Sequence, residues 1–375
     1  MPSPDFLIVG GGIAGAATAW FLAQRGAGSV LVLDREAELG AHSTAKNAGI
    51  LRTWIAEPST RELAQESLRF LAAPPAGFSE VPLFDACGLV LEIQDEQRAA
   101  FDAWVARRVG GAEPLDEVAF RARLPHVAWR PGNWFLIPDD GRLDAAAIHA
   151  SFVSGARRAG AEFRTGAGVR ELLVRDGAVR GVRLDDGTEL HAGRTVMAAG
   201  GWAGKLARAA GSPLVLHPRR RHLLVTAIDA SIDTHWPVIW SDREKYYARP
   251  ESGGMMICAC DETEVDPDDC RVDDAVLDMI AARAETHLPS FADAGAAHYW
   301  CGMRTFADDP RFVIGDDPEL AGLFWVAGLG GHGMTCSAAV GRLAADLLTG
   351  SDGGPIAKAV DPRRLVEDRT SAART

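Results

Sequence analysis

The chain has 375 residues, of which 47% are hydrophobic and 24% charged, so it can bury a substantial core and is neither disordered nor fibrous. A formal charge of −12 argues against binding to nucleic acid or to an anionic membrane surface through bulk electrostatics. Glycine is over-represented, at 40 residues, and the excess gathers directly after predicted strands.

The first 34 residues have the pattern of a βαβ unit. A short apolar strand is predicted at 6–9 and stops at three glycines, and a helix with apolar residues at helical spacing is predicted at 13–25. The next apolar run, 30–33, predicts a second strand that ends in Asp34. The N-terminus lacks the basic start of a signal peptide, so we expect a cytoplasmic protein without a transmembrane segment.

The glycines of this unit match the dinucleotide-binding fingerprint GxGxxG. Gly10, Gly12 and Gly15 permit a tight turn, close approach of a pyrophosphate and close packing of the helix. Asp34 follows Gly10 at about the spacing expected of the acid that accepts a ribose hydroxyl. Since a carboxylate repels a 2′-phosphate, the pattern predicts FAD or NAD rather than NADP.

Later elements predict a mixed α/β fold. Asp-Gly dipeptides separate the segments 169–174, 178–184 and 189–190, which predicts an antiparallel meander. Residues 195–199 predict a buried strand, closed by Gly200 and Gly201. A last strand at 323–327 runs into the glycine-rich turn 328–333, before a predicted helix at 337–348. Such a turn aims backbone N–H groups at the electron-rich edge of a flavin, which favours FAD over NAD.

The remaining stretches suggest a second domain. Residues 81–140 and 215–303 contain all three tyrosines and most of the tryptophans, and we assign them to a substrate domain built on an antiparallel sheet. Residues 1–80, 141–214 and 304–375 are assigned to a discontinuous FAD-binding Rossmann-type domain that carries the meander. The acidic run 266–274 is interpreted as a solvated surface turn. No metal site is predicted, since Cys258 and Cys260 lack a second pair.

Several segments carry a resemblance to a known family. GGGIAGAATAWFLAQRG, GAHSTAKNAG, VMAAGGWAG, WCGMRTF and FWVAGLGGHGMTCSAA are similar to those of the FAD-dependent amine and amino-acid oxidoreductases, the family of glycine oxidase, sarcosine oxidase and D-amino-acid dehydrogenase. Within it, the chain resembles bacterial D-arginine dehydrogenase most. The resemblance implies hydride transfer from a substrate C–H bond to flavin N5, with the substrate carboxylate held by arginine and tyrosine.

The resemblance also assigns cofactor contacts. Asp34 and Arg35 would meet the adenosine ribose, the segment 42–48 would wrap the pyrophosphate and ring, and the last glycine-rich turn would face the flavin. The full predicted set is Gly10, Gly12, Ile13, Ala14, Gly15, Asp34, Arg35, His42, Ser43, Thr44, Asn47, Ala48, Gly49, Val169, Gly200, Trp202, Gly330, Gly331, His332, Gly333, Met334 and Thr335. FAD is expected to be noncovalent, because Asn47 and Gly302 stand where linked relatives carry histidine or cysteine.

The predicted catalytic and substrate-binding residues are Arg304, Tyr247, Arg221 and His332. Arg304 would form a bidentate pair with the substrate carboxylate, and Arg221 and Tyr247 would complete the clamp. The alternative is a purely structural role. The arginine triplet 219–221 would then lie on a solvated surface, and Tyr247 would be an ordinary core residue. His332 either tunes the flavin and the substrate amine or simply fills space.

The substrate prediction comes from two departures from D-arginine dehydrogenase. Ile50 stands where that enzyme has a histidine, and Leu89 where it has a glutamate for the cationic side chain. We therefore expect oxidation of a neutral D-amino acid or N-alkyl amino acid to an imino acid, which hydrolyses to a 2-oxo acid.

Three alternatives stay open at this point. They are a flavin-dependent 2-hydroxy-acid dehydrogenase with His332 as base, a tailoring oxidase of a cyclic or carrier-bound amine, and a non-catalytic flavoprotein subunit. The electron acceptor, either oxygen or a quinone or carrier protein, is also open, as are the stereochemistry and the oligomeric state.

Overall fold

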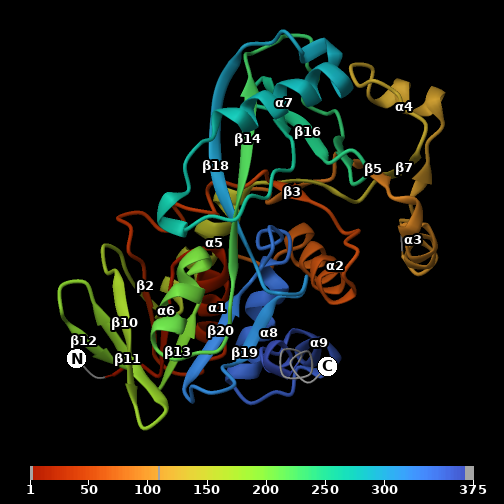
Figure 1. The fold of residues 1–375 in the computed structure, drawn as a ribbon. Helices are drawn as coiled ribbons and strands as arrows, with labels where there is room; N and C mark the ends of the chain where they lie inside the picture. Colours follow the sequence, from red (N-terminus) through yellow and green to blue (C-terminus); the bar gives the residue numbers. More distant parts are fainter. Residues whose placement is uncertain (1–2, 109, 368–375) are drawn as a thin grey trace, which may run out of the picture.

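The computed structural model describes residues 3–108 and 110–367, whose strands form four sheets (Figure 1). One sheet has six strands, and all its neighbours are parallel except the antiparallel pair β19–β20. Its order is β19 (Val313–Asp316), β20 (Leu323–Ala327), β13 (Arg194–Met197), β1 (Phe6–Val9), β2 (Val30–Leu33) and β9 (Glu162–Arg164). The predicted α/β class with a mostly parallel Rossmann-type sheet is therefore confirmed.

The alternating side chains of β1 divide the core around this sheet into two layers. Phe6 and Ile8 pack in one cluster with residues of several helices, among them α1 (Ile13–Gln24), α5 (Ala145–Arg158) and α8 (Ser337–Leu348). Leu7 and Val9 face a second cluster that includes α6 (Ala203–Ala209) and the meander. Continuous apolar runs such as 6–9 are strands because both of their faces are covered.

The antiparallel meander forms as predicted, from β10 (Val169–Arg175), β11 (Ala178–Leu184) and β12 (Glu189–His191). Asp176 and Gly177, between β10 and β11, both have positive φ, at 52° and 70°. That backbone matches the twist of the flanking strands, which explains why an Asp-Gly dipeptide marks this hairpin. In Figure 1 the meander lies at the edge of the molecule, beside α6.

The largest sheet has eight strands and is antiparallel except for the pair β5–β15. Its order is β18 (Ala296–Phe306), β14 (His217–Thr226), β17 (Gly254–Cys258), β16 (Tyr246–Glu251), β15 (Val238–Ser241), β5 (Leu89–Ile93), β7 (Asn133–Ile137) and β6 (Glu113–Pro114). In Figure 1 the long strands β14 and β18 run from this sheet down to the six-stranded one. β18 continues past the predicted domain boundary at residue 304, and the division into domains stays a prediction.

The other elements complete both halves. A small sheet joins β3 (Ile50–Leu51), β8 (Gly141–Leu143) and β4 (Phe84–Asp85). The remaining helices are α2 (Pro58–Ala72), α3 (Arg98–Val105), α4 (Glu117–Arg123), α7 (Asp274–His287) and α9 (Gly354–Val360). Within residues 3–108 and 110–367, no helix is both long and apolar enough to cross a bilayer.

Candidate cofactor and substrate site

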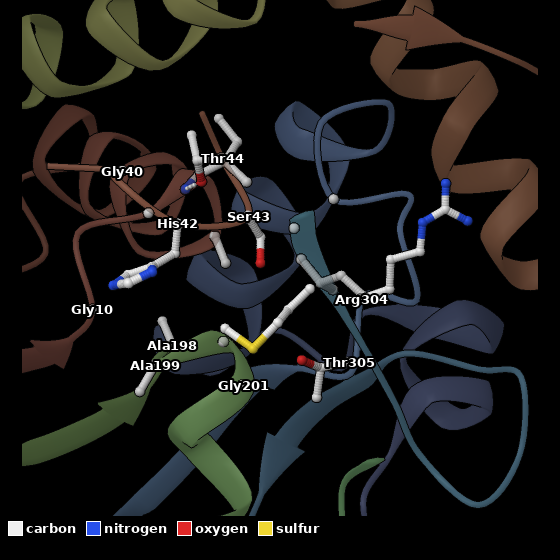
Figure 2. Close-up of a pocket in the computed structure, with 18 of the residues that line it drawn as sticks. Gly10, Gly40, His42, Ser43, Thr44, Ala198, Ala199, Gly201, Arg304 and Thr305 are labelled. Carbon is white, nitrogen blue, oxygen red and sulfur yellow. Dashed lines mark hydrogen bonds between the residues drawn. The ribbon is translucent and has the colours of Figure 1, made fainter. Parts of the chain in front are cut away.

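A cavity of about 870 Å³ lies at the carboxyl ends of the parallel strands and extends to the eight-stranded sheet. Segments that follow β1, β2, β13 and β20 line one part of it, and side chains of β14, β16 and β18 line the other. Figure 2 shows Gly10, His42 and Thr44 on one side of this cavity and Arg304 and Thr305 on another. Open α/β sheets bind ligands in such a crevice.

The structure brings nearly all of the predicted site residues together. The lining includes Gly10, Gly12, Ile13, Ala14, Asp34, Arg35, His42, Ser43, Thr44, Asn47, Ala48, Gly49, Ile50, Val169, Gly200, Trp202, Arg221, Tyr247, Gly330, Gly331, His332, Gly333, Met334, Thr335 and Arg304. Gly15 lies just behind the wall, where a Cβ atom would overlap the carbonyl oxygen of Gly10. Leu89 is also outside the cavity, fully buried on β5 in a hydrophobic cluster with Ile50 and Tyr247.

The fingerprint loop presents bare backbone to the cavity. Gly10 has a φ of 107°, and a side chain there would overlap the carbonyl of Ala198. Gly12 caps α1 with no side-chain hydrogen bond, so the positive end of the helix faces the cavity. The same segment is anchored by Thr44, whose hydroxyl oxygen accepts the N–H of Ile13 at 3.0 Å. A glycine cradle at a helix N-terminus fits a pyrophosphate.

Asp34 is held in a fixed orientation at the end of β2. Its Oδ2 accepts the N–H of Gly11 at 2.8 Å, and its Oδ1 accepts the N–H of Glu36 at 2.9 Å. Each carboxylate oxygen has a second lone pair, so the side chain keeps acceptor capacity toward the cavity. The residue therefore fits the predicted role of binding a ribose hydroxyl.

The acidic run 266–274 is mostly exposed, as expected of a solvated surface turn, but one of its residues also takes part in the site. Asp268 lines the cavity and accepts a hydrogen bond from Trp202 Nε1 at 2.7 Å and another from Lys205 Nζ at 2.8 Å. These two hydrogen bonds lower the pKa of Asp268 to about 2. The guanidinium of Arg35, 3.4 Å from Asp268, lies over the Trp202 ring. The Asp268 side chain is half exposed, so it is solvated as expected, but its contacts with Trp202, Lys205 and Arg35 were not predicted because these partners lie far away in sequence.

The last glycine-rich turn is fixed on both sides. The N–H of Gly330 donates to the carbonyl of Thr305 at 2.9 Å, and the Thr335 hydroxyl donates to the carbonyl of Ile50 at 3.0 Å. At Gly331, where φ is 85°, a Cβ atom would lie 2.7 Å from Cδ of Arg304. Glycine here leaves room for the Arg304 side chain.

Arg304 and Tyr247 meet at the wall of the cavity. Nη2 of Arg304 donates to the Tyr247 hydroxyl at 3.4 Å. The Tyr247 ring stacks on Trp240, with centroids 4.3 Å apart. Burial, followed by the nearby Cys258, raises the pKa of Tyr247 well above its usual value, so the hydroxyl keeps its proton as a donor. The neighbouring Tyr246 faces away and stacks on His287, as an ordinary core residue would.

Two other arginines of the cavity already have acidic partners. Arg221, of which 4% is exposed, donates to Glu262 Oε1 at 2.7 Å. Arg52, which the sequence analysis missed, donates to Asp242 at 2.8 Å and lies over the ring of Trp240. Arg52 could have been predicted as a site residue from its position two residues after Ile50, because side chains two apart lie on the same side of an extended chain. In contrast, Arg304 makes no ion pair with any residue that the structure describes.

His332 lies in the wall close to all three arginines. Burial, followed by the positive charges of Arg52, Arg304 and Arg221, lowers the pKa of His332 to about 3. The imidazole is therefore neutral at pH 7 and is a weak base. Of the two roles considered for His332, this environment disfavours that of a proton acceptor.

A glycine cradle, an acid fixed at the end of the second strand and a cation-lined cavity together define a dinucleotide-binding oxidoreductase. The model of the family FAD dependent oxidoreductase matches residues 5–347. The chain therefore belongs to this family, as the motifs predicted, and FAD is its cofactor.

Relatives of known function include amine and amino-acid oxidoreductases. The chain is 26% identical to 4-methylaminobutanoate oxidase (formaldehyde-forming) of Paenarthrobacter nicotinovorans over 96% of its own length, and it spans only 45% of that enzyme. It is 27% identical to glycine oxidase of Pseudomonas putida, covering 93% of this chain and 96% of that one. The structure of L-proline dehydrogenase from P. horikoshii has a TM-score of 0.86 at 20% identity, over 98% of this chain and 99% of that one.

Proposed function

We propose that this protein oxidises the C–N bond of a neutral D-amino acid or N-alkyl amino acid. The product is an imino acid, which water converts to a 2-oxo acid and ammonia or an amine. When bound, FAD supplies the acceptor for the substrate hydride. The observation that carries the proposal is the cation of Arg304, which has no acidic partner among the described residues and lies beside the Tyr247 hydroxyl.

This pair is suited to a carboxylate. A guanidinium presents two parallel N–H donors to the two oxygens of a carboxylate, and the neutral hydroxyl of Tyr247 adds a third donor. Glu262 neutralises Arg221 and Asp242 neutralises Arg52, so a single bound carboxylate would balance the charge of Arg304. The turn at Gly331 supports the guanidinium from behind and restricts its movement.

The charges of the cavity support a neutral substrate side chain. The acidic residues of the lining all lie close in space to Arg35 or Gly168. They are Asp34, Glu36, Asp185 and Asp268. Near Arg304 the lining is cationic or apolar, with Ile50, Leu223 and Trp240 as apolar surfaces. A cationic side chain would find no free carboxylate there, and an unpaired buried charge costs several kcal/mol, on the order of 3. This argument replaces the one from Leu89, which lies outside the cavity.

The state of His332 supports an amine over a hydroxyl as the reacting group. A 2-hydroxy acid must lose its hydroxyl proton to a base, and a group with a pKa of about 3 is poorly matched to that task. An amine that binds in its neutral form already has the lone pair that forms the C=N bond. It needs no protein base when the hydride leaves.

Relatives add support of a different kind. They include proteins named 4-methylaminobutanoate oxidase, glycine oxidase and D-amino acid dehydrogenase, whose names all refer to amino acids or an N-methylated amine. The six cysteines are all free thiols, which supports the cytoplasmic location that we propose. Oxygen or a quinone or carrier protein would reoxidise the flavin.

The test is anaerobic bleaching of the flavin by a panel of D- and L-amino acids, N-methyl amino acids and 2-hydroxy acids. We expect D-Met, D-Phe, D-Leu or D-Pro, or their N-methyl forms, to reduce the flavin faster than D-Arg and D-Lys. Faster reduction by the cationic amino acids or by 2-hydroxy acids would overturn the proposal. Admitting air afterwards measures reoxidation by oxygen and separates an oxidase from a dehydrogenase.

A further inference from the structure

Two cysteines meet beside the cofactor cavity although they are 31 residues apart in sequence. Sγ of Cys270 lies 3.3 Å from Sγ of Cys301. Cys301 belongs to β18, and Cys270 directly follows the 3₁₀ turn Pro267–Asp269. We propose that these thiols are an oxidisable pair, and that their disulfide fastens the acidic segment (residues 266–270) to β18 and slows the release of FAD.

The geometry of the pair permits the bond. A disulfide is about 2.05 Å long, so the two sulfurs need to approach by only about 1 Å. Cys301 is 3% exposed, whereas Cys270 is half-buried and can be reached by a small oxidant. Because the side chains of β18 alternate, Cys301 faces away from the side on which Arg304 lines the cavity. Oxidation would thus leave the proposed carboxylate site in place.

The chemistry of the pair is asymmetric. The hydrogen bond from the Cys301 thiol, helped by the positive charges of Lys46 and Arg220, outweighs burial and lowers the pKa of Cys270 to about 7. The same contact raises the pKa of Cys301, which stays protonated. A thiolate is the reactive form of cysteine, so Cys270 is the attacking residue at neutral pH.

Hydrogen peroxide is the oxidant that we name for this step. The Cys270 thiolate attacks one peroxide oxygen, and the O–O bond breaks to leave a sulfenic acid and hydroxide. The Cys301 sulfur then attacks the sulfenic sulfur, the S–O bond breaks, and water leaves with the Cys301 proton. The proton first released by Cys270 neutralises the hydroxide. In total, two thiols lose two hydrogens, and one peroxide is reduced to two waters.

The acidic segment and β18 both belong to the wall that surrounds the cofactor. Asp268, two residues before Cys270, lines the cavity, and so does Gly302, directly after Cys301. Pro267 and Met303 pack together over Gly201, where a Cβ atom would lie within 3.2 Å of both. In the reduced protein, hydrogen bonds and ion pairs of Asp268 hold the segment, and salt weakens such exposed pairs. A disulfide would hold it independently of salt.

The first experiment identifies the bond. The FAD-loaded protein is treated with hydrogen peroxide or left with dithiothreitol, and intact mass and peptide mapping follow under denaturing conditions. We expect a loss of two hydrogens and one cross-linked peptide that joins positions 270 and 301. A cross-link between Cys258 and Cys260 would overturn the proposal; these two also lie close, since the backbone N–H of Cys260 donates to Sγ of Cys258 at 3.3 Å. Conversion of Cys270 to a sulfinic acid without any cross-link would do so as well.

The second experiment measures the consequence. Release of FAD into high-salt buffer is followed by the rise in flavin fluorescence, for oxidised and reduced protein. We expect release to be about 5-fold slower after oxidation in the wild type, with no such difference in Cys270→Ser or Cys301→Ser. Cys87→Ser serves as the matched control and should keep the difference, because Cys87 is half-buried in another part of the chain. Equal release rates for oxidised and reduced wild type would overturn the proposal. Neither experiment depends on the identity of the substrate.

Discussion

The hydroxyl oxygen of Tyr247 lies 3.4 Å from Nη2 of Arg304, although 57 residues separate the two in sequence. The two groups come from β16 and β18, which are not neighbours in the eight-stranded sheet. Both line the cavity, where the nearby Arg52 and Arg221 are already paired with acids. This relationship marks the position at which an anion is most strongly favoured.

Replacing Arg304 tests this position directly. Arg304→Lys keeps the charge but loses the bidentate geometry, so we expect kcat/KM for the best substrate to fall about 100-fold, mostly through KM. Bound FAD should be unchanged, as measured by its absorbance. Arg311→Lys is the control, because Arg311 pairs with Asp309 outside the cavity and its loss should leave kcat/KM within about 2-fold. An unchanged KM in Arg304→Lys would contradict the assignment.

The two adjacent tyrosines offer a matched pair of variants. Tyr247→Phe removes one neutral donor while keeping the ring that stacks on Trp240. We expect a rise in KM of about 10-fold, corresponding to one lost hydrogen bond. Tyr246→Phe removes the hydroxyl of the tyrosine that stacks on His287, on the other face of the sheet. This variant should leave KM unchanged. Equal effects of both variants on KM would show that Tyr247 acts only through packing.

Gly15 tests the packing of the fingerprint. In Gly15→Ala the new methyl group overlaps the carbonyl oxygen of Gly10, so the loop must shift. We expect a loss of about 1–3 kcal/mol in the free energy of unfolding and weaker FAD binding. Gly295→Ala is the control, since a Cβ atom there has no neighbour within 4 Å. Thermal unfolding and titration with FAD measure both effects.

His332 predicts a pH dependence of stability. Its pKa is about 3 in the folded chain and about 6.5 when unfolded, so the unfolded state binds more protons between these values. Stability is therefore lost as the pH falls below 6.5, by about 1 kcal/mol at pH 5.5. His332→Gln should lose less stability than the wild type between pH 7 and 5.5, measured by chemical unfolding. His235→Gln, at an exposed histidine, should retain the wild-type slope.

The attachment of FAD has a simple test. Asn47 and Gly302 stand where linked relatives have reactive side chains, and both line the cavity. We expect acid precipitation to leave a colourless pellet and all flavin in the supernatant. Yellow colour that stays with the denatured protein would show a covalent bond, and mass mapping would identify the linked residue.

Local patterns were enough to predict much of the fold. The βαβ unit, the meander and the last strand each depend on apolar runs that end at glycine, where backbone conformation decides the turn. The observed ends of some elements differ slightly from the predicted ones. The strand β13 ends at Met197 rather than at residue 199, because residues 200–202 form a 3₁₀ turn. The helix predicted at 13–25 ends at Gln24, with Arg25 as its C-cap.

The parts of the site that were missed depend on partners distant in sequence. Asp242 and Arg52 are 190 residues apart, and Arg35 and Asp268 are 233 apart, so neither pair leaves a local pattern. Leu89 was placed by comparison with a relative, but the β5 strand buries it between β15 and β7. Sequence similarity finds the strand more readily than it finds the side of the strand that faces the substrate.

The pairing of β14 with β18 restricts how the site can open. The two strands pair at ten positions, from His217 with Phe306 to Thr226 with Ala296, with one register shift between Val225 and Thr226, and in Figure 1 they run from the upper part of the molecule toward the six-stranded sheet. Rotation of one half of the molecule against the other would break many of these backbone hydrogen bonds at once. We therefore expect molecules to reach the cavity when loops at its edge move, while β14 and β18 stay paired. A hinge motion of the two halves of the molecule is not expected.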